Sequence, residues 1–274
     1  MSSDIKNILA AACSESTVFA DLFCEHRLVM SAGVENGRLS NIALTKESGS
    51  SLRRFDGSHI DFECREGLSE GIFDELTTPS LPSFATLDEA IHQFISGACR
   101  IRYDWESGCQ RIQVCNTTGR LARETRSWQR TKIIAGMERN GRHHSISLHT
   151  CTPIEKQDTC DEICSRLQAH ADAVQKADSL PAKRCSVILP PGLSGVFFHE
   201  TCGHSLEADA AGSFQCLIGR SVGSKLITLI DDATIPDEAG SIRVDDEGFS
   251  TVRRVLIEKG IMKSVLSDWH SAQR

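Results

Sequence analysis

An alternation of apolar and polar residues with a period of two runs through the middle of the 274-residue chain. It covers residues 111–115 and 131–135 and returns at residues 146–148. Successive side chains of a strand point to opposite faces of a sheet, so this pattern predicts strands with one buried face. Turn signals at residues 116–120 and at Asn140-Gly141 separate the segments at hairpin spacing. The sequence therefore predicts an antiparallel meander.

Segments with helical spacing flank this meander. Apolar residues at positions 5, 8, 9 and 12 indicate an N-terminal helix, and residues 18–24 form a β-type run. Thr86 and Glu89 have the spacing of a capping box, which predicts a helix that starts there. A second apolar stripe predicts a helix over residues 161–176. Residues 78–83, rich in Pro and Ser, resemble a linker, so we expect a domain boundary there.

We expect an α+β or mixed α/β fold in three parts. Residues 1–80 form an N-terminal α+β domain, and residues 84–184 form the meander with its connecting helices. Residues 185–274 form a mixed-sheet domain around a short apolar helix that begins near Val196. Its strands are expected at residues 185–189 and 226–230 and in a hairpin at residues 255–266.

Composition and simple motifs argue against several classes of function. The 30 basic and 37 acidic residues are interspersed and give a net charge of -7, so no basic face for nucleic acid is present. No glycine loop of the kind that holds a flavin or nucleotide phosphate occurs. The 12 cysteines are scattered without C-x2-C pairs. The sequence shows neither a secretory signal nor an apolar run long enough for a membrane, so we expect reduced thiols and a cytoplasmic protein.

The chemistry of the chain is concentrated in residues 199–204, His-Glu-Thr-Cys-Gly-His. Two imidazoles can hold a metal ion, and a neighbouring carboxylate can take a proton from a metal-bound water. The alternative is structural: one histidine satisfied in a helix core and the other on the surface. The residue types alone leave both interpretations open, because such a short motif also arises by chance.

The spacing of the two histidines is unusual for a metal-binding helix. In the common H-E-x-x-H form the histidines are four residues apart and share one face. Five residues separate His199 from His204, which on a regular α-helix would leave the two side chains about 140° apart. A π-bulge or a local unwinding around Cys202-Gly203 would bring them together, and we predict such a distortion.

The surrounding sequence resembles the TldD branch of the TldD/PmbA family of metallopeptidases. Residues 195–209 match its pattern G-V-x-x-H-E-x-x-G-H-x-L-E-x-D, after an apolar run and a Pro/Gly turn. The likeness continues through residues 230–234 and 244–248 and the hairpin at residues 255–266. Weaker matches lie at residues 20–22, 35–37 and 116–120.

This resemblance implies that His199 and His204 bind zinc and that Glu200 is the catalytic general base. It implies a peptidase for unfolded or extended peptides, including modified precursor peptides of ribosomally made natural products. It also implies a homodimer, or a heterodimer with a TldE/PmbA-like subunit that lacks the motif. The alternative is a non-catalytic or truncated family member that binds peptide or serves as a dimerisation subunit.

The third zinc ligand is the point at which the chain departs from the family. The family uses a cysteine far downstream in its C-terminal domain, and no residue of this chain matches it, so we expect that this C-terminal part is lacking. Substitutes from within the chain are Cys202, Cys216, Glu207, Asp209 and His270. The acidic groups Asp231-Asp232 and Asp245-Asp246-Glu247 could hold a hard cation, but Asp is also common in turns between strands.

Overall fold

The computed structural model describes residues 2–67, 73–95, 98–139, 141–152, 158–178, 182–208, 214–238 and 240–273. The chain forms two compact units. The sheet unit comprises Met1–Ser179 with Pro236–Gly240, and the motif unit comprises Leu180–Ile235 with Ser241–Arg274.

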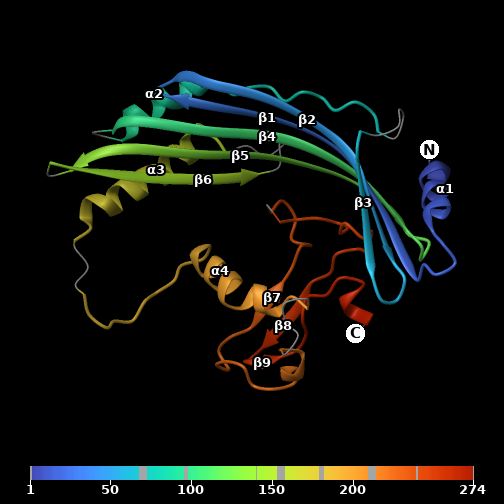
Figure 1. Cartoon of the computed structure of the whole chain (residues 1–274). Helices are drawn as coiled ribbons and strands as arrows, with labels where there is room; N and C mark the ends of the chain where they lie inside the picture. The colour runs from blue at the N-terminus through green and yellow to red at the C-terminus, as the bar shows by residue number, and fades with distance from the viewer. Residues whose placement is uncertain are drawn as a thin grey trace. The chain divides into compact units, whose positions relative to one another are not determined.

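A six-stranded antiparallel sheet with the order β3-β2-β1-β4-β5-β6 dominates the sheet unit (Figure 1). Its strands are β1 (Phe19–Glu35), β2 (Arg38–Phe55), β3 (Ile60–Glu66), β4 (Ala98–Asn116), β5 (Leu121–Arg139) and β6 (Arg142–Thr152). The meander predicted from the alternating pattern corresponds to β4, β5 and β6. In the turn between β4 and β5, the Asn116 side-chain oxygen accepts hydrogen bonds from the amides of Thr118 and Arg120. Of the predicted Asn140-Gly141 turn, Asn140 lies outside the described residues.

Three helices pack against apolar side chains of this sheet. They are α1 (Ser2–Ala12), α2 (Phe84–Phe94) and α3 (Cys160–Lys176). Ile5 and Leu9 of α1 pack in one core cluster with Leu22 and Cys115 of the sheet. A second cluster joins residues of α2 and α3 to alternate residues of β4, β5 and β6: Leu87, Ile91, Ile163, Cys164, Leu167, Ala171, Ile101, Tyr103, Ile133, Ala135, Met137, Ile146 and Leu148. The α+β class expected from the sequence is confirmed.

The sheet continues across the boundary expected near residue 80. Strand β1 pairs with β4 from Asp21 opposite Asn116 to Glu35 opposite Arg102, so strands from both sides of that boundary are neighbours in one sheet. Residues 78–83 connect β3 to α2 without forming a helix or strand. The linker-like composition therefore marks a connection inside the sheet unit, because antiparallel pairing over a long separation leaves no local sequence signal. The units divide instead at Ser179, close to the boundary expected at residue 184.

The predicted capping box at Thr86 and Glu89 is wrong. Helix α2 begins earlier, with Ser83 as its N-cap, and Thr86 lies inside the first turn, where its hydroxyl is 2.8 Å from that of Ser83. A complete capping box occurs at α3, where the Thr159 hydroxyl accepts from the Glu162 amide and the Glu162 carboxylate accepts from the Thr159 amide. Both helices have the T-x-x-E pattern, so the pattern alone does not fix the first residue of a helix.

The motif unit is built from short elements. They are α4 (Leu193–Phe198), the π-helical turn η1 (His199–Gly203), the 3-10 turns η2 (His204–Leu206), η3 (Phe214–Leu217) and η4 (Ser271–Gln273), and the antiparallel strands β7 (Leu229–Asp231), β8 (Arg254–Glu258) and β9 (Ile261–Met262). Its core consists of Leu206, Ala208, Leu256, Ile257, Met262 and Val265. The hairpin predicted at residues 255–266 is confirmed by β8 and β9.

Three details of this unit differ from the sequence prediction. The strand expected at residues 226–230 begins only at Leu229, as β7. Residues 185–189 are not a strand, although the apolar run predicts one, and Ile188 is 92% exposed. Helix α4 is capped by Gly192, with a φ of 89°, instead of beginning near Val196. In the part of the chain that the structure describes, no helix is long and apolar enough to cross a membrane.

Candidate metal centre

The extra residue between the two histidines is taken up by a π-helical turn. The backbone N–H of His204 donates to the carbonyl oxygen of His199, five residues earlier, and residues His199–Gly203 form the turn. The predicted distortion at this position is therefore confirmed. Gly203 keeps right-handed dihedrals, with a φ of -55° and a ψ of -60°. The turn consequently changes the hydrogen-bond register without the left-handed backbone that would require glycine.

Thr201 contributes a side-chain hydrogen bond to the same turn. Its hydroxyl donates to the carbonyl oxygen of Phe197 across 2.7 Å. A threonine hydroxyl that bonds the carbonyl four residues earlier competes with the regular backbone ladder and often bends a helix. Thr201 therefore supports the irregular geometry at the junction of α4 and η1. Thr201 is not a candidate ligand or base, but a Thr within a short apolar helix is a sequence feature that indicates such a bond.

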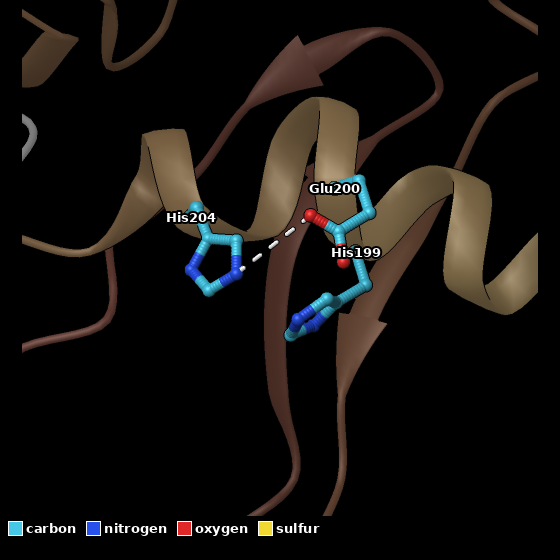
Figure 2. Close-up of side chains that lie close together, drawn as sticks. All are labelled: His199, Glu200 and His204. Carbon is cyan, nitrogen blue, oxygen red and sulfur yellow. Dashed lines mark ion pairs between the residues drawn. The ribbon is translucent and has the colours of Figure 1, made fainter.

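The turn brings the side chains of His199, Glu200 and His204 into one group (Figure 2). One ligand atom from each residue lies within 4.8 Å of the other two. The imidazole ring centroids are 4.5 Å apart, and His204 Nε2 lies 4.0 Å from Glu200 Oε2. All three residues are exposed, so the group is open to solvent and to a large substrate.

His204 also makes a hydrogen bond on the other side of its ring. Its Nδ1 lies 3.0 Å from Glu207 Oε1. The two ring nitrogens of His204 therefore face different carboxylates, Glu207 at Nδ1 and Glu200 at Nε2. The sequence left Glu207 open as a metal ligand or as a neighbour of the ligands, and the structure shows it against His204 and not in the three-residue group.

The donor set suits a zinc ion. Two imidazole nitrogens and a carboxylate are ligands or proton acceptors in zinc hydrolase sites, and Zn–N bonds of about 2.0–2.1 Å require nitrogens only a few ångströms apart. The ligand atoms of the group, all within 4.8 Å of one another, are close enough to share one ion. If zinc binds, His199 and His204 would hold it, and Glu200 would be the neighbouring proton acceptor.

The other candidate ligands lie outside this group. Among the described residues, Cys202, Cys216 and His270 are not part of it, and Asp209 lies outside the described residues. Asp232 accepts hydrogen bonds from the amide and hydroxyl of Thr234, which lowers the pKa of its carboxyl. Asp245 accepts from the amides at positions 247 and 249. Asp232 and Asp245 therefore each stabilise a turn, and Asp231 is the last residue of β7. This agrees with the frequent occurrence of Asp in turns between strands.

Residues 182–274 match the family model described as the PmbA/TldA metallopeptidase C-terminal domain. This segment nearly coincides with the motif unit. The resemblance to the TldD/PmbA family is confirmed.

The curated relatives are named as metalloproteases. A metalloprotease of Methanocaldococcus jannaschii is 44% identical over 103 residues, which is 36% of this chain and 23% of that protein. A zinc metalloprotease TldD homolog of Saccharolobus solfataricus is 30% identical over 111 residues, or 39% of this chain and 25% of that protein. A metalloprotease TldD homolog of Haemophilus influenzae is 39% identical over 101 residues, or 35% of this chain and 21% of that protein. The matching segment thus spans about a quarter of the length of these relatives.

Solved structures resemble the whole chain in fold. TldE of Thermococcus kodakarensis has a TM-score of 0.76 at 15% identity and covers 98% of this chain, with 71% of its own length matched. A protein of Thermotoga maritima described as a putative modulator of a DNA gyrase has a TM-score of 0.78 at 14% identity, with 100% of this chain and 72% of its own length matched. The likeness in fold to these two structures therefore includes the sheet unit.

Proposed function

We propose that the protein is a zinc-dependent peptidase of the TldD type, with His199 and His204 as zinc ligands and Glu200 as general base. The observation that carries this proposal is the π-helical turn at His199–Gly203, which places one ligand atom from each of these residues within 4.8 Å of the others. A regular α-helix with the same sequence would separate the histidines. The names of the curated relatives give independent support for a metallopeptidase and for zinc.

Each residue of the group has one task in this proposal. Bound zinc supplies a Lewis acid that polarises the scissile carbonyl and acidifies water. His199 and His204 offer neutral imidazole nitrogens, and Glu200 accepts a proton from the attacking water and delivers it to the leaving amine. The exposure of the group, with side chains of His204 and Glu200 57% and 64% exposed, suits a substrate that approaches as an extended chain.

The proposed substrates are unfolded or extended peptides, including precursor peptides that are processed to natural products. The proposed assembly is a homodimer or a heterodimer with a TldE/PmbA-like subunit in the cytoplasm. The likeness in fold to a protein named TldE supports a partner of that kind.

Zinc content and turnover of matched variants test the proposal. The purified chain, alone and with a TldE-like partner, is analysed for zinc and incubated with an unstructured peptide, and products are identified by mass spectrometry. Glu200→Gln is expected to abolish cleavage and to leave the zinc content unchanged, while His199→Ala is expected to lose both. Glu258→Gln, a change on β8 outside the group, serves as the control and keeps both properties.

The competing hypothesis of a non-catalytic subunit predicts a different result. It gives substoichiometric zinc and no turnover under either condition. Cleavage that persists in Glu200→Gln after removal of contaminating peptidases would rule out the general-base assignment.

A further inference from the structure

We propose that Glu207 is a positioning residue that fixes the tautomer and the orientation of His204. The inference rests on the proposed function, because it concerns how one proposed zinc ligand is prepared. Its first observation is the 3.0 Å hydrogen bond between His204 Nδ1 and Glu207 Oε1. An ionised carboxylate can only accept a hydrogen bond, so Nδ1 of a neutral His204 must carry the proton.

This assignment leaves the other ring nitrogen with its lone pair. Nε2 of His204 faces the group, 4.0 Å from Glu200 Oε2, and Figure 2 shows that side of the ring turned toward Glu200. Only an unprotonated nitrogen can bind a metal ion. The contact with Glu207 therefore selects the tautomer whose free nitrogen points into the three-residue group.

The backbone around Glu207 is anchored on both sides. Leu206 and Ala208 are buried in the core of the motif unit, at 5% and 8% exposure. The carbonyl of Leu206 accepts from the amide of Leu266 across 2.8 Å, and the amide of Ala208 donates to the carbonyl of Leu266 across 2.7 Å. Glu207 thus lies in a short parallel bridge to Leu266, where its extended backbone has a φ of -71° and a ψ of 129°.

This anchoring distinguishes Glu207 from an exposed glutamate that meets a histidine by chance. Helix α4 and turn η1 contain no buried residue among those described, so little packing holds the first part of the motif. Glu207 links the ring of His204 to the first well-packed segment after the motif. Carboxylate partners of metal-binding histidines commonly raise metal affinity by about 10–100-fold.

The decisive experiment measures the tautomer of His204 in the metal-free chain. Protein with 15N-labelled histidine is studied by NMR well above the ordinary imidazole pKa of about 6.5. The wild-type chain is expected to show His204 protonated at Nδ1, and Glu207→Ala is expected to show a population protonated at Nε2. Glu258→Ala, which removes an exposed glutamate of the same unit, is expected to match the wild type. An unchanged His204 spectrum in Glu207→Ala would overturn the proposal.

Zinc affinity, measured by competition with a chelator, gives the second readout. We expect Glu207→Ala to bind zinc about 10–100-fold more weakly and Glu207→Gln to lie between it and the wild type, because the amide can still accept from Nδ1. Complete loss of zinc with an unchanged tautomer would make Glu207 a ligand and overturn the positioning role. The tautomer is read without metal, so failure of the wild-type chain to bind zinc would refute the proposed function and leave the tautomer result standing.

Discussion

The amide of His204 hydrogen-bonds to the carbonyl of His199, five residues earlier, and this contact closes the π-helical turn that contains the motif. In a regular α-helix the same amide would bond to the carbonyl of Glu200, four residues earlier. The shift by one residue absorbs the extra position and leaves the two imidazole centroids 4.5 Å apart. The longer spacing is therefore compatible with a metal site because the helix changes register inside the motif.

The hydroxyl of Thr201 provides the first prediction. Thr201→Val keeps the shape of the side chain but removes the 2.7 Å bond to the Phe197 carbonyl. We expect a local loss of about 1 kcal/mol, seen as faster amide hydrogen exchange at residues 201–204 and weaker zinc binding. Thr201→Ser retains the hydroxyl and should exchange at the wild-type rate. Equal exchange in all three proteins would show that this bond does not support the turn.

The distorted turn between His199 and His204 could be predicted from the sequence, because helix geometry fixes the angle between two residues of known spacing. The angle between His199 and His204 on a helix follows from residue spacing, so the need for a distorted turn can be calculated. The bond between Glu207 and His204 could not be predicted in the same way, because it depends on a 3-10 turn and on a bridge to Leu266. Spacing alone left Glu207 as one of several possible ligands.

The fold shows the same division between local and long-range information. Period-two alternation identified the meander, and alternate residues of its strands do enter one core: Ile101 and Tyr103, Ile133, Ala135 and Met137, and Ile146 and Leu148. The pairing of β1 with β4 joins residues far apart in sequence, and the sequence of neither strand indicates which strand it pairs with. Residues 185–189 illustrate a local signal that misleads. Their apolar run predicts a strand, but such a run forms a strand only when another segment pairs with it.

Gly260 provides a prediction about stability in the motif unit. It has a φ of +78°, and an added Cβ would lie 2.4 Å from the Gly223 carbonyl oxygen and 2.7 Å from that of Ser224. Gly260→Ala therefore combines backbone strain with a steric clash, and we expect a loss above about 3 kcal/mol.

Gly119 is the matched control for this change. Its φ is +87°, but no atom lies within 4 Å of an added Cβ, so Gly119→Ala should cost only about 1–2 kcal/mol of backbone strain. Urea unfolding, followed by hydrogen exchange in each unit, measures both effects. Similar losses for the two variants would contradict the clash at Gly260.

Asp56 makes the stability of the sheet unit dependent on pH. Its carboxylate accepts hydrogen bonds from the amides of Ser58 and His59 and from the Ser58 hydroxyl, which lowers its pKa from 3.8 to about 2. Because the folded-state pKa is the lower one, this contribution is fully present above about pH 4 and is lost as the pH falls toward 2.

Asp56→Asn removes this ionisation while keeping an acceptor in the turn between β2 and β3. We expect the variant to lose less stability than the wild type when the pH is lowered from about 5 to about 3, measured as the shift of the urea midpoint. Glu15→Gln, an exposed change elsewhere in the unit, should retain the wild-type slope. A steeper acid dependence in Asp56→Asn would reverse the assigned sign.

Two buried cysteines provide the last prediction. The 12 cysteines, all among the described residues, form no disulfide with one another, but their surroundings differ. Burial raises the pKa of Cys24 to about 11 and that of Cys115 to about 12. The thiolate is the reactive form, and at pH about 8 a thiol with such a pKa is about a thousandth ionised or less. Both sulfurs also pack with residues of α1 in one core cluster, so a reagent in solution cannot reach them.

Iodoacetamide should therefore alkylate the exposed Cys64, Cys99 and Cys185 first, and Cys24 and Cys115 only after denaturation. Peptide mapping by mass spectrometry over a time course measures the order, with urea-unfolded protein as the reference in which all five react. Labelling of Cys24 in the native chain at the rate of Cys185 would show that the cluster around α1 opens on the time scale of the reaction.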